Sequence, residues 1–183
     1  MQKPGTVYSI HNFLIVLLLV AMPASAESPP ELGSVQAAFE LLNGDGEAVQ
    51  FDDYAGQNVL VAFGFTNCAH ICPMIAANMA RAIRASDKDV IGLFISVDTE
   101  RDSPATTAAY AQKFGDKMIG LSGSYQQVSD AAQNFGVSYV VTKSQNNYTV
   151  QHTPSIFLIG PDGELVDTFA MNTPSADITA AMQ

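Results

Sequence analysis

Two long apolar runs with an amphipathic segment between them limit the folds open to this chain more than any other feature. The runs are VLVAFGF (59–65) and VIGLFISV (90–97), and each is typical of a strand buried on both faces. Between them, Ile75, Met79 and Ile83 recur every four residues, which predicts a helix with one apolar face. A strand, a helix and a strand at this spacing form a parallel, right-handed unit. The sequence therefore predicts an α/β fold.

The remaining patterns extend this unit in both directions. Residues 37–42 and 47–51 flank a turn-forming Asn-Gly-Asp-Gly segment and predict a hairpin at the domain entrance. A sheet with parallel strands inside, a hairpin at one edge and helices on both faces is thioredoxin-like, with a central mixed sheet and an N-terminal β-hairpin. The other expected elements are helices at 103–114 and 125–135, strands at 138–141, 148–150, 156–159 and 164–169, and a short C-terminal helix.

The first residues carry the features of a secretory signal. Lys3 precedes an apolar stretch at 13–22, and Ala-Ser-Ala at 24–26 is a small-x-small cleavage pattern. Export predicts a periplasmic location, with an anchor in the inner membrane if the segment is not cleaved. The expected parts are a signal peptide or N-terminal anchor at 1–26, a linker at 27–35 and a thioredoxin-like domain at 36–183.

Charge and cysteine content exclude several classes of partner and scaffold. The chain has 8 Lys and Arg against 18 Asp and Glu, a formal net charge of −10, which argues against binding nucleic acid. Hydrophobic residues make up 48% of the chain, which is enough to fill a core. The only two cysteines, Cys68 and Cys72, exclude a disulfide-dense scaffold and a four-cysteine zinc site. Any thiol chemistry therefore takes place at this pair.

Cys68 and Cys72 lie where the first apolar run ends and the amphipathic helix begins. The start of a helix carries partial positive charge and free N–H groups, which favour a thiolate over a thiol. The alternative is a structural disulfide, but closing so short a loop contributes only about 2 kcal/mol. We therefore favour a redox-active or metal-binding pair. Three residues separate the cysteines, whereas thioredoxin-type oxidoreductases have two between them.

His152 supplies a third potential donor. It follows a predicted strand and precedes Thr153-Pro154, a segment that lies beside the cysteine helix in a thioredoxin-like fold. Two thiolates and one imidazole favour copper, because soft sulfur ligands suit Cu(I) and nitrogen helps to retain Cu(II). Zinc accepts the same donors, so the donor set alone leaves both metals open.

Most of the chain after the linker resembles the Sco/SenC family of copper chaperones. The resemblance implies a thioredoxin-like protein of the periplasm or mitochondrial inner membrane that helps to assemble the CuA centre of cytochrome c oxidase. The matching stretches, in family order and spacing, are FGFTNCAHICP (63–73), SVDTERDSP (96–104) and YTVQHTPSIFLIGPDGEL (148–165).

This resemblance implies roles for the three donors. Cys68, Cys72 and His152 would bind copper, and the two cysteines would also cycle between dithiol and disulfide. The implied partner is the copper-bearing subunit of cytochrome c oxidase or another periplasmic copper protein. The rival hypothesis is a periplasmic thiol-disulfide oxidoreductase that acts on protein disulfides and binds metal incidentally. A thiol peroxidase on the same scaffold is a third class.

An acidic pair and three methionines each have both a structural and a functional interpretation. Asp98 and Asp102 match an acidic pair of the family. Asp102 and Ser103 can cap the helix that begins at Pro104, and we expect both acids to serve this structural role rather than to transfer protons. Met74, Met79 and Met118 fall in or beside predicted helices, so we expect them to pack in the core rather than to bind copper.

The sequence departs from the family beside the expected ligands. Ala69 and His70 stand where the family commonly has Pro and Asp, and Gln151 replaces the acidic residue usual before the histidine. Such changes alter the surroundings of the ligands and with them the affinity for metal. His70 must lie near the site, where it either points to solvent or adds a nitrogen donor for Cu(II). We also expect a cis bond before Pro154 that turns the preceding histidine toward the thiolates.

Overall fold

The computed structural model describes residues 35–182. The predicted signal peptide or anchor at 1–26 lies outside the described residues, as does the predicted linker at 27–35 apart from Val35. Within the described part of the chain, no helix is both long enough and apolar enough to cross a membrane.

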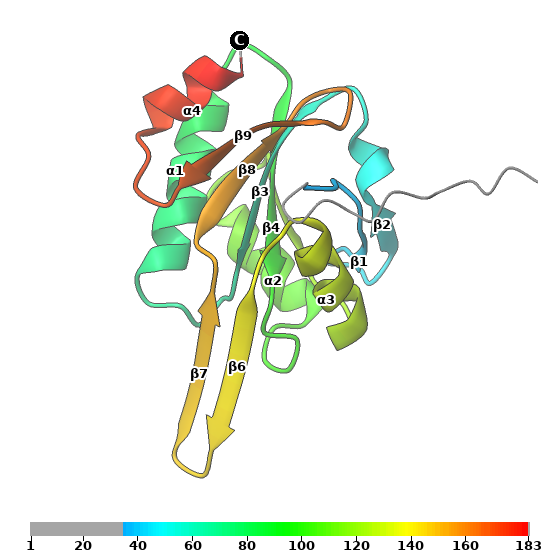
Figure 1. The fold of residues 1–183 in the computed structure, drawn as a ribbon, viewed down its shortest axis with the longest axis vertical. Helices are drawn as coiled ribbons and strands as arrows, with labels where there is room; N and C mark the ends of the chain where they lie inside the picture. Colours follow the sequence, from blue (N-terminus) through cyan, green and yellow to red (C-terminus); the bar gives the residue numbers. More distant parts are fainter. Residues whose placement is uncertain (1–34, 183) are drawn as a thin grey trace, which may run out of the picture. The chain divides into compact units, whose positions relative to one another are not determined.

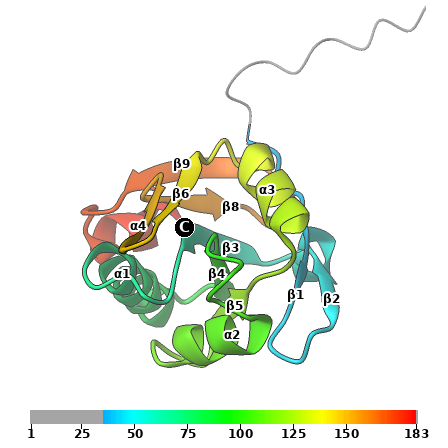
Figure 2. The ribbon, with the colours of Figure 1, turned by 90° about the horizontal axis from the view of Figure 1, so that it is seen from below.

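A five-stranded mixed sheet with the order β5-β4-β3-β8-β9 forms the centre of the fold (Figures 1 and 2). β3 (Asn58–Gly64) and β4 (Val90–Ser96) pair in parallel, as the two apolar runs predict. β5 (Met118–Leu121) continues the parallel part, whereas β8 (Ser155–Ile159) runs antiparallel to β3, and β9 (Leu165–Ala170) antiparallel to β8. Parallel strands end at a common edge, and the candidate site lies there.

Alternate side chains of β3 fill two cores on opposite faces of the sheet. Val61 and Phe63 belong to one core, and Leu60 and Ala62 belong to the other. Helix α3 contributes to the first core and the other three helices to the second; Figure 2 shows α1 and α4 on the opposite side of the sheet from α3. Within residues 35–182 the α-helices are α1 (Ile71–Ala85), α2 (Pro104–Gln112), α3 (Tyr125–Asn134) and α4 (Ser175–Ala181).

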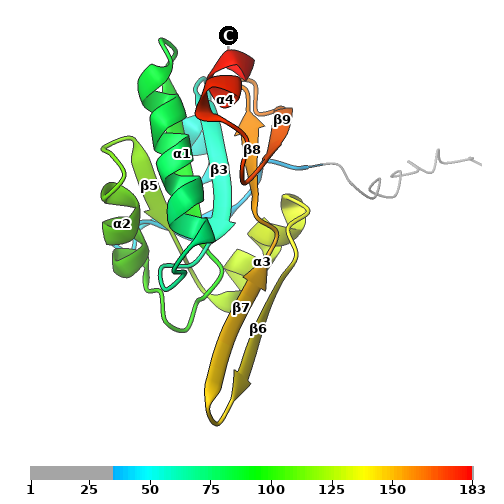
Figure 3. The ribbon, with the colours of Figure 1, turned by 90° about the vertical axis from the view of Figure 1, so that its left-hand side faces the viewer.

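Two antiparallel hairpins stand outside the central sheet. β1 (Glu40–Leu42) and β2 (Ala48–Gln50) form the predicted N-terminal hairpin, and a 3-10 turn at Phe51–Tyr54 follows it. β6 (Tyr139–Ser144) and β7 (Asn147–His152) form the second hairpin. Figures 1 and 3 show this hairpin projecting past the edge at which β3 ends and α1 begins. The end of β7 is therefore placed close to the cysteines.

The predicted thioredoxin-like fold class is confirmed, but some details differ. Met118, expected in or beside a helix, is buried in β5, a short strand that the sequence patterns did not indicate. Helix α2 packs so closely on this strand that a Cβ at Gly120 would lie 2.1 Å from the carbonyl oxygen of Thr107. Met79 is buried as expected, whereas Met74 is 51% exposed, so core packing was the wrong expectation for Met74.

Candidate metal centre

The two cysteines lie where β3 passes into α1. Cys68 is half-buried in the connecting loop, and Cys72 is buried in the first turn of the helix. Gly64 ends β3 beside them, and a Cβ at this position would lie 2.7 Å from the Phe94 ring and 3.2 Å from Cys72 Sγ. Glycine therefore lets the buried thiol pack against the end of the strand. Both cysteines are free thiols.

The start of α1 stabilises negative charge on Cys68. The backbone N–H of Cys72 donates a hydrogen bond to Cys68 Sγ at 3.3 Å. Partial burial raises the pKa of Cys68, but hydrogen bonds from the Cys72 thiol and from the N–H groups of Cys72, His70 and Ile71 outweigh it and lower the pKa. Burial raises the pKa of Cys72, and the hydrogen bond to Cys68 raises it further. Cys68 is therefore the more readily ionised thiol.

His152 ends β7 and faces the buried thiol. Its Nε2 lies 3.5 Å from Cys72 Sγ, and its Nδ1 lies 3.1 Å from the carbonyl oxygen of Thr153. A carbonyl can only accept a hydrogen bond, so Nδ1 carries the proton and the Nε2 lone pair faces Cys72 Sγ. Burial lowers the pKa of His152, although the hydrogen bond to Thr153 acts against this shift. The imidazole is therefore held neutral, which is the form that binds metals.

The fold thus gathers two thiols and an imidazole from segments that are 80 residues apart in the chain. Phe65 lies edge-on to the His152 ring at 6.0 Å between centroids and forms one wall of the cluster. Within residues 35–182, no three His, Cys, Asp or Glu side chains already form a complete metal site. The three predicted donors are neighbours, but as placed they do not converge on one point.

His70 lies beside this cluster but presents its side chain to solvent. It is the N-cap residue of α1, and its side chain is exposed. Its backbone N–H contributes to the lowered pKa of Cys68. The structure thus gives the backbone of His70 a role beside Cys68, while its imidazole points toward solvent, the first of the two orientations expected for it.

Asp102 connects the cysteine loop to the end of β4 instead of capping α2. Its carboxylate accepts hydrogen bonds from the Thr66 backbone N–H at 2.7 Å, the Thr66 hydroxyl at 2.6 Å and the Ser96 hydroxyl at 2.6 Å. The cap of α2 is Ser103, whose hydroxyl accepts from the N–H of Thr106 at 3.1 Å. The capping prediction is confirmed for Ser103 but was wrong for Asp102, because the Asp102 carboxylate is engaged by Thr66 and Ser96 at the ends of two neighbouring strands.

Asp98 also departs from the capping prediction. It is fully buried and accepts a hydrogen bond from Arg101 Nε at 2.5 Å and one from the Tyr148 hydroxyl at 2.5 Å. Neither partner was predicted from the sequence. Arg101 and Tyr148 do lie in two of the stretches that carry the family resemblance, and this was the available signal.

The predicted cis bond before Pro154 is absent, since no peptide bond in residues 35–182 is cis. Other contacts orient the segment. The N–H of Thr153 donates to the carbonyl oxygen of Ser138 at 3.0 Å, and the N–H of Ser138 donates to the Thr153 hydroxyl at 3.2 Å. These bonds continue the β6–β7 ladder by one residue and place His152 against Cys72 with a trans bond. The cis prediction was therefore wrong.

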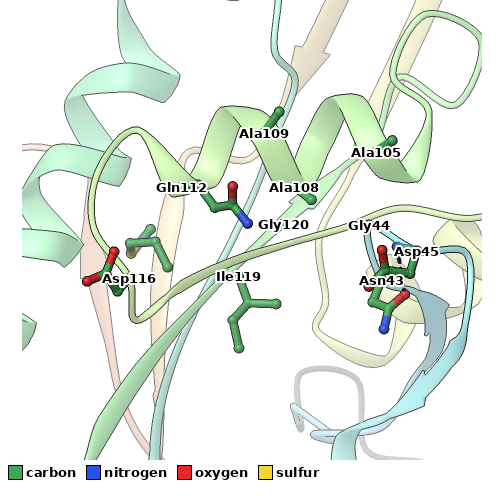
Figure 4. Close-up of a pocket in the computed structure, with 11 residues that line it drawn as sticks. Asn43, Gly44, Asp45, Ala105, Ala108, Ala109, Gln112, Asp116, Ile119 and Gly120 are labelled. Atoms are coloured by element: carbon green, nitrogen blue, oxygen red, sulfur yellow. Dashed lines mark hydrogen bonds between the residues drawn. The ribbon is translucent and has the colours of Figure 1, made fainter.

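A separate pocket lies between the turn that follows β1 and the α2–β5 pair (Figure 4). Small residues such as Ala105, Ala108 and Gly120 line it together with polar and larger apolar ones. Asp45 and Asp116 lie at opposite ends of it in Figure 4. The pocket contains neither cysteine nor His152, so we do not assign it to the same chemistry.

Comparison with known proteins shows that this sequence matches one protein family. The sequence profile described as SCO1/SenC matches residues 27–183. The human mitochondrial SCO1 homologue is 36% identical over 151 residues, which cover 79% of this chain and 50% of the human protein. The chain thus spans about half the length of the human and mouse mitochondrial SCO1 homologues.

Solved structures agree with the sequence comparison. Arabidopsis thaliana ScoI with copper bound superposes with a TM-score of 0.72 at 32% identity, covering 80% of this chain and 94% of ScoI. BsSco, described as having a disulfide switch and as a member of the Sco family of cytochrome c oxidase assembly proteins, gives a TM-score of 0.65 at 29% identity, covering 83% of this chain and 94% of BsSco. This chain belongs to the SCO1/SenC family.

Proposed function

We propose that this chain is a copper-binding metallochaperone that assists assembly of the CuA centre of cytochrome c oxidase. One observation carries the proposal. His152 Nε2 lies 3.5 Å from Cys72 Sγ, and Cys68 accepts a hydrogen bond from the same helix turn. Copper bound to ScoI and the oxidase-assembly role stated for the family of BsSco support it.

The donor set suits copper as a cargo. Thiolate sulfurs favour Cu(I), and a neutral imidazole supports both Cu(I) and Cu(II). The carbonyl of Thr153 holds the proton of His152 on Nδ1, so Nε2 is ready to bind without losing a proton. Binding by both cysteines would release their thiol protons, Cys68 first because its pKa is lowered. We therefore propose Cys68, Cys72 and His152 as the ligands.

The difference in pKa between Cys68 and Cys72 also favours a second activity, the reduction of a disulfide in the partner protein. The Cys68 thiolate would attack one sulfur of that disulfide and form a mixed disulfide while the other partner sulfur leaves and gains a proton. Cys72 would then lose its proton and attack Cys68 Sγ, which releases the second partner thiol. The partner gains two electrons, and this chain is left with the Cys68–Cys72 disulfide. The disulfide switch described for BsSco supports this proposal.

The proposal also covers the roles of the N-terminal residues. We propose that residues 1–26 export the chain to the periplasm, or anchor it in the inner membrane if they are retained. Residues 27–35 would then tether the domain at 36–183 within reach of a membrane-bound oxidase subunit. The Pro-Pro pair at 29–30 and the lack of a periodic pattern support a tether.

Metal content after export tests the proposed function. Wild-type chain, purified under reducing conditions, is expected to hold one copper, and Cys68→Ser, Cys72→Ser and His152→Ala are each expected to lose most of it. Thr149→Ala is the matched control, since Thr149 is exposed on the outer face of β7 and away from the histidine. Full copper content in both cysteine variants would overturn the proposal. Zinc in place of copper would contradict the assigned cargo.

A reductase that binds metal only incidentally gives a different result. It would reduce a disulfide of the oxidase copper subunit at the wild-type rate in His152→Ala, while copper delivery to that subunit would be absent even in the wild type. Copper delivery by the wild type that fails in His152→Ala supports the chaperone assignment.

A further inference from the structure

The β6–β7 hairpin that carries His152 has little support from the rest of the sheet. Its two strands pair only with each other among the described strands, and most of their side chains are exposed. A two-stranded hairpin is only marginally stable by itself in water. The position of His152 therefore depends on whatever contacts hold this hairpin to the body of the protein.

One face of β7 makes those contacts. Tyr148, Val150 and His152 alternate with exposed residues, so all three point to the same side of the strand. Val150 packs against the core on the α3 side of the sheet. Tyr148 lies four residues before His152, a span of about 13 Å along a strand. Tyr148 and His152 are thus the two polar ends of one inward face.

Tyr148 is bound to the turn that follows β4. Its hydroxyl donates to Asp98 Oδ1 at 2.5 Å, and the same carboxylate accepts from Arg101 Nε at 2.5 Å. The guanidinium of Arg101 also lies over the Tyr148 ring, 3.9 Å from its centroid. Because Asp98 is fully buried, losing one of its donors is unfavourable. We call this Asp98–Arg101–Tyr148 group the latch.

Neighbouring contacts extend the latch to both strands and to the site. Lys143 of β6 forms an ion pair with Glu100, which lies in the same turn. Arg101 also lies 5.9 Å from the centroid of Phe65, the residue that packs edge-on against His152. Arg101 therefore lies near both Tyr148, which anchors the hairpin, and Phe65, which packs against the His152 ring.

We infer that Tyr148 is a positioning residue for copper binding, which holds His152 against the cysteines through the latch. The inference rests on the proposed function, because it requires His152 to be a copper ligand. When the latch opens, the hairpin carries the imidazole away while copper stays on the two sulfurs. The latch thereby sets the rate at which copper leaves for a partner or a chelator.

The test uses reduced full chain loaded with one equivalent of Cu(I) and mixed with excess Cu(I)-specific chelator. Tyr148→Phe removes the hydroxyl but keeps the ring under Arg101, and we expect copper release to become about tenfold faster. Tyr125→Phe is the matched control, since Tyr125 is 67% exposed on α3, and it should release copper at the wild-type rate. Electron paramagnetic resonance of the Cu(II) form should shift toward the spectrum of His152→Ala.

A double variant separates positioning from general destabilisation. If Tyr148 acts through His152, adding Tyr148→Phe to His152→Ala gives no further acceleration of copper release. The same acceleration in both backgrounds would overturn the inference, as would wild-type release by Tyr148→Phe. If His152→Ala itself behaves as wild type, the proposed ligand set fails instead, so the two failures are distinguishable.

Discussion

Replacing Asp102 tests how the loop that carries Cys68 is held. The carboxylate is 1% exposed and accepts three hydrogen bonds, two from Thr66 and one from Ser96. In Asp102→Ala all three donors lose their acceptor. Each buried donor left unpaired costs about 1–3 kcal/mol, but the two hydroxyls can rotate to other acceptors while the Thr66 N–H cannot. We therefore expect a loss of about 3 kcal/mol in the free energy of unfolding.

Asp102→Asn is expected to cost only about 1 kcal/mol. Its amide oxygen can replace Oδ2, which accepts from the Thr66 N–H and the Ser96 hydroxyl, and its NH₂ group can donate to the Thr66 hydroxyl. Urea unfolding of the reduced chain measures both changes as shifts of the midpoint at constant m-value. The exposed Asp130→Ala serves as a control and should stay within about 0.5 kcal/mol of wild type. Equal effects of Asn and Ala, or a loss below about 1 kcal/mol for Ala, would refute this reasoning.

Three further predictions concern the site. Iodoacetamide should label Cys68 well before Cys72 in the metal-free chain, because only the pKa of Cys68 is lowered; equal labelling by peptide mass spectrometry contradicts this. Gly64→Ala should destabilise the fold by about 1–3 kcal/mol, because its Cβ would lie 2.7 Å from the Phe94 ring, and an unchanged melting temperature argues against it. Cu(II) affinity should fall with decreasing pH as protons compete for His152. Burial lowers the pKa of His152, so the loss, measured against His152→Ala, should be centred below about pH 6.5 and not above it.

Local sequence patterns predicted the strands and helices whose residues keep one regular pattern of burial along the whole element. β3 and β4 are buried along almost their whole length, so their apolar runs are unbroken. Helix α1 has one apolar face, and the cysteines mark its start. β5 has only four residues, and no local pattern distinguishes it from a connecting loop. Its strand character depends on pairing with β4 and on the close approach of α2 at Gly120.

The candidate site likewise consists of residues that local sequence patterns predicted and of contacts that they did not. Cys68 and Cys72 were identified from their place between strand and helix, and His152 from its place before the next strand. The contacts around them depend on residues far apart in the chain. Asp102 meets Thr66 across 36 residues, and Tyr148 meets Asp98 across 50, so neither pairing has a local signature. The cis prediction for Pro154 failed for a similar reason, because the hairpin ladder already orients the histidine.

X-ray absorption at the copper edge tests the central claim most directly. For the full chain loaded with one equivalent of Cu(I), we predict scattering from two sulfur atoms and one imidazole nitrogen. The imidazole contribution should disappear in His152→Ala and persist in Thr149→Ala, since Thr149 is exposed on the outer face of β7. A spectrum without sulfur scatterers, or an imidazole signal that His152→Ala leaves unchanged, would contradict the assignment of Cys68, Cys72 and His152 as the copper ligands.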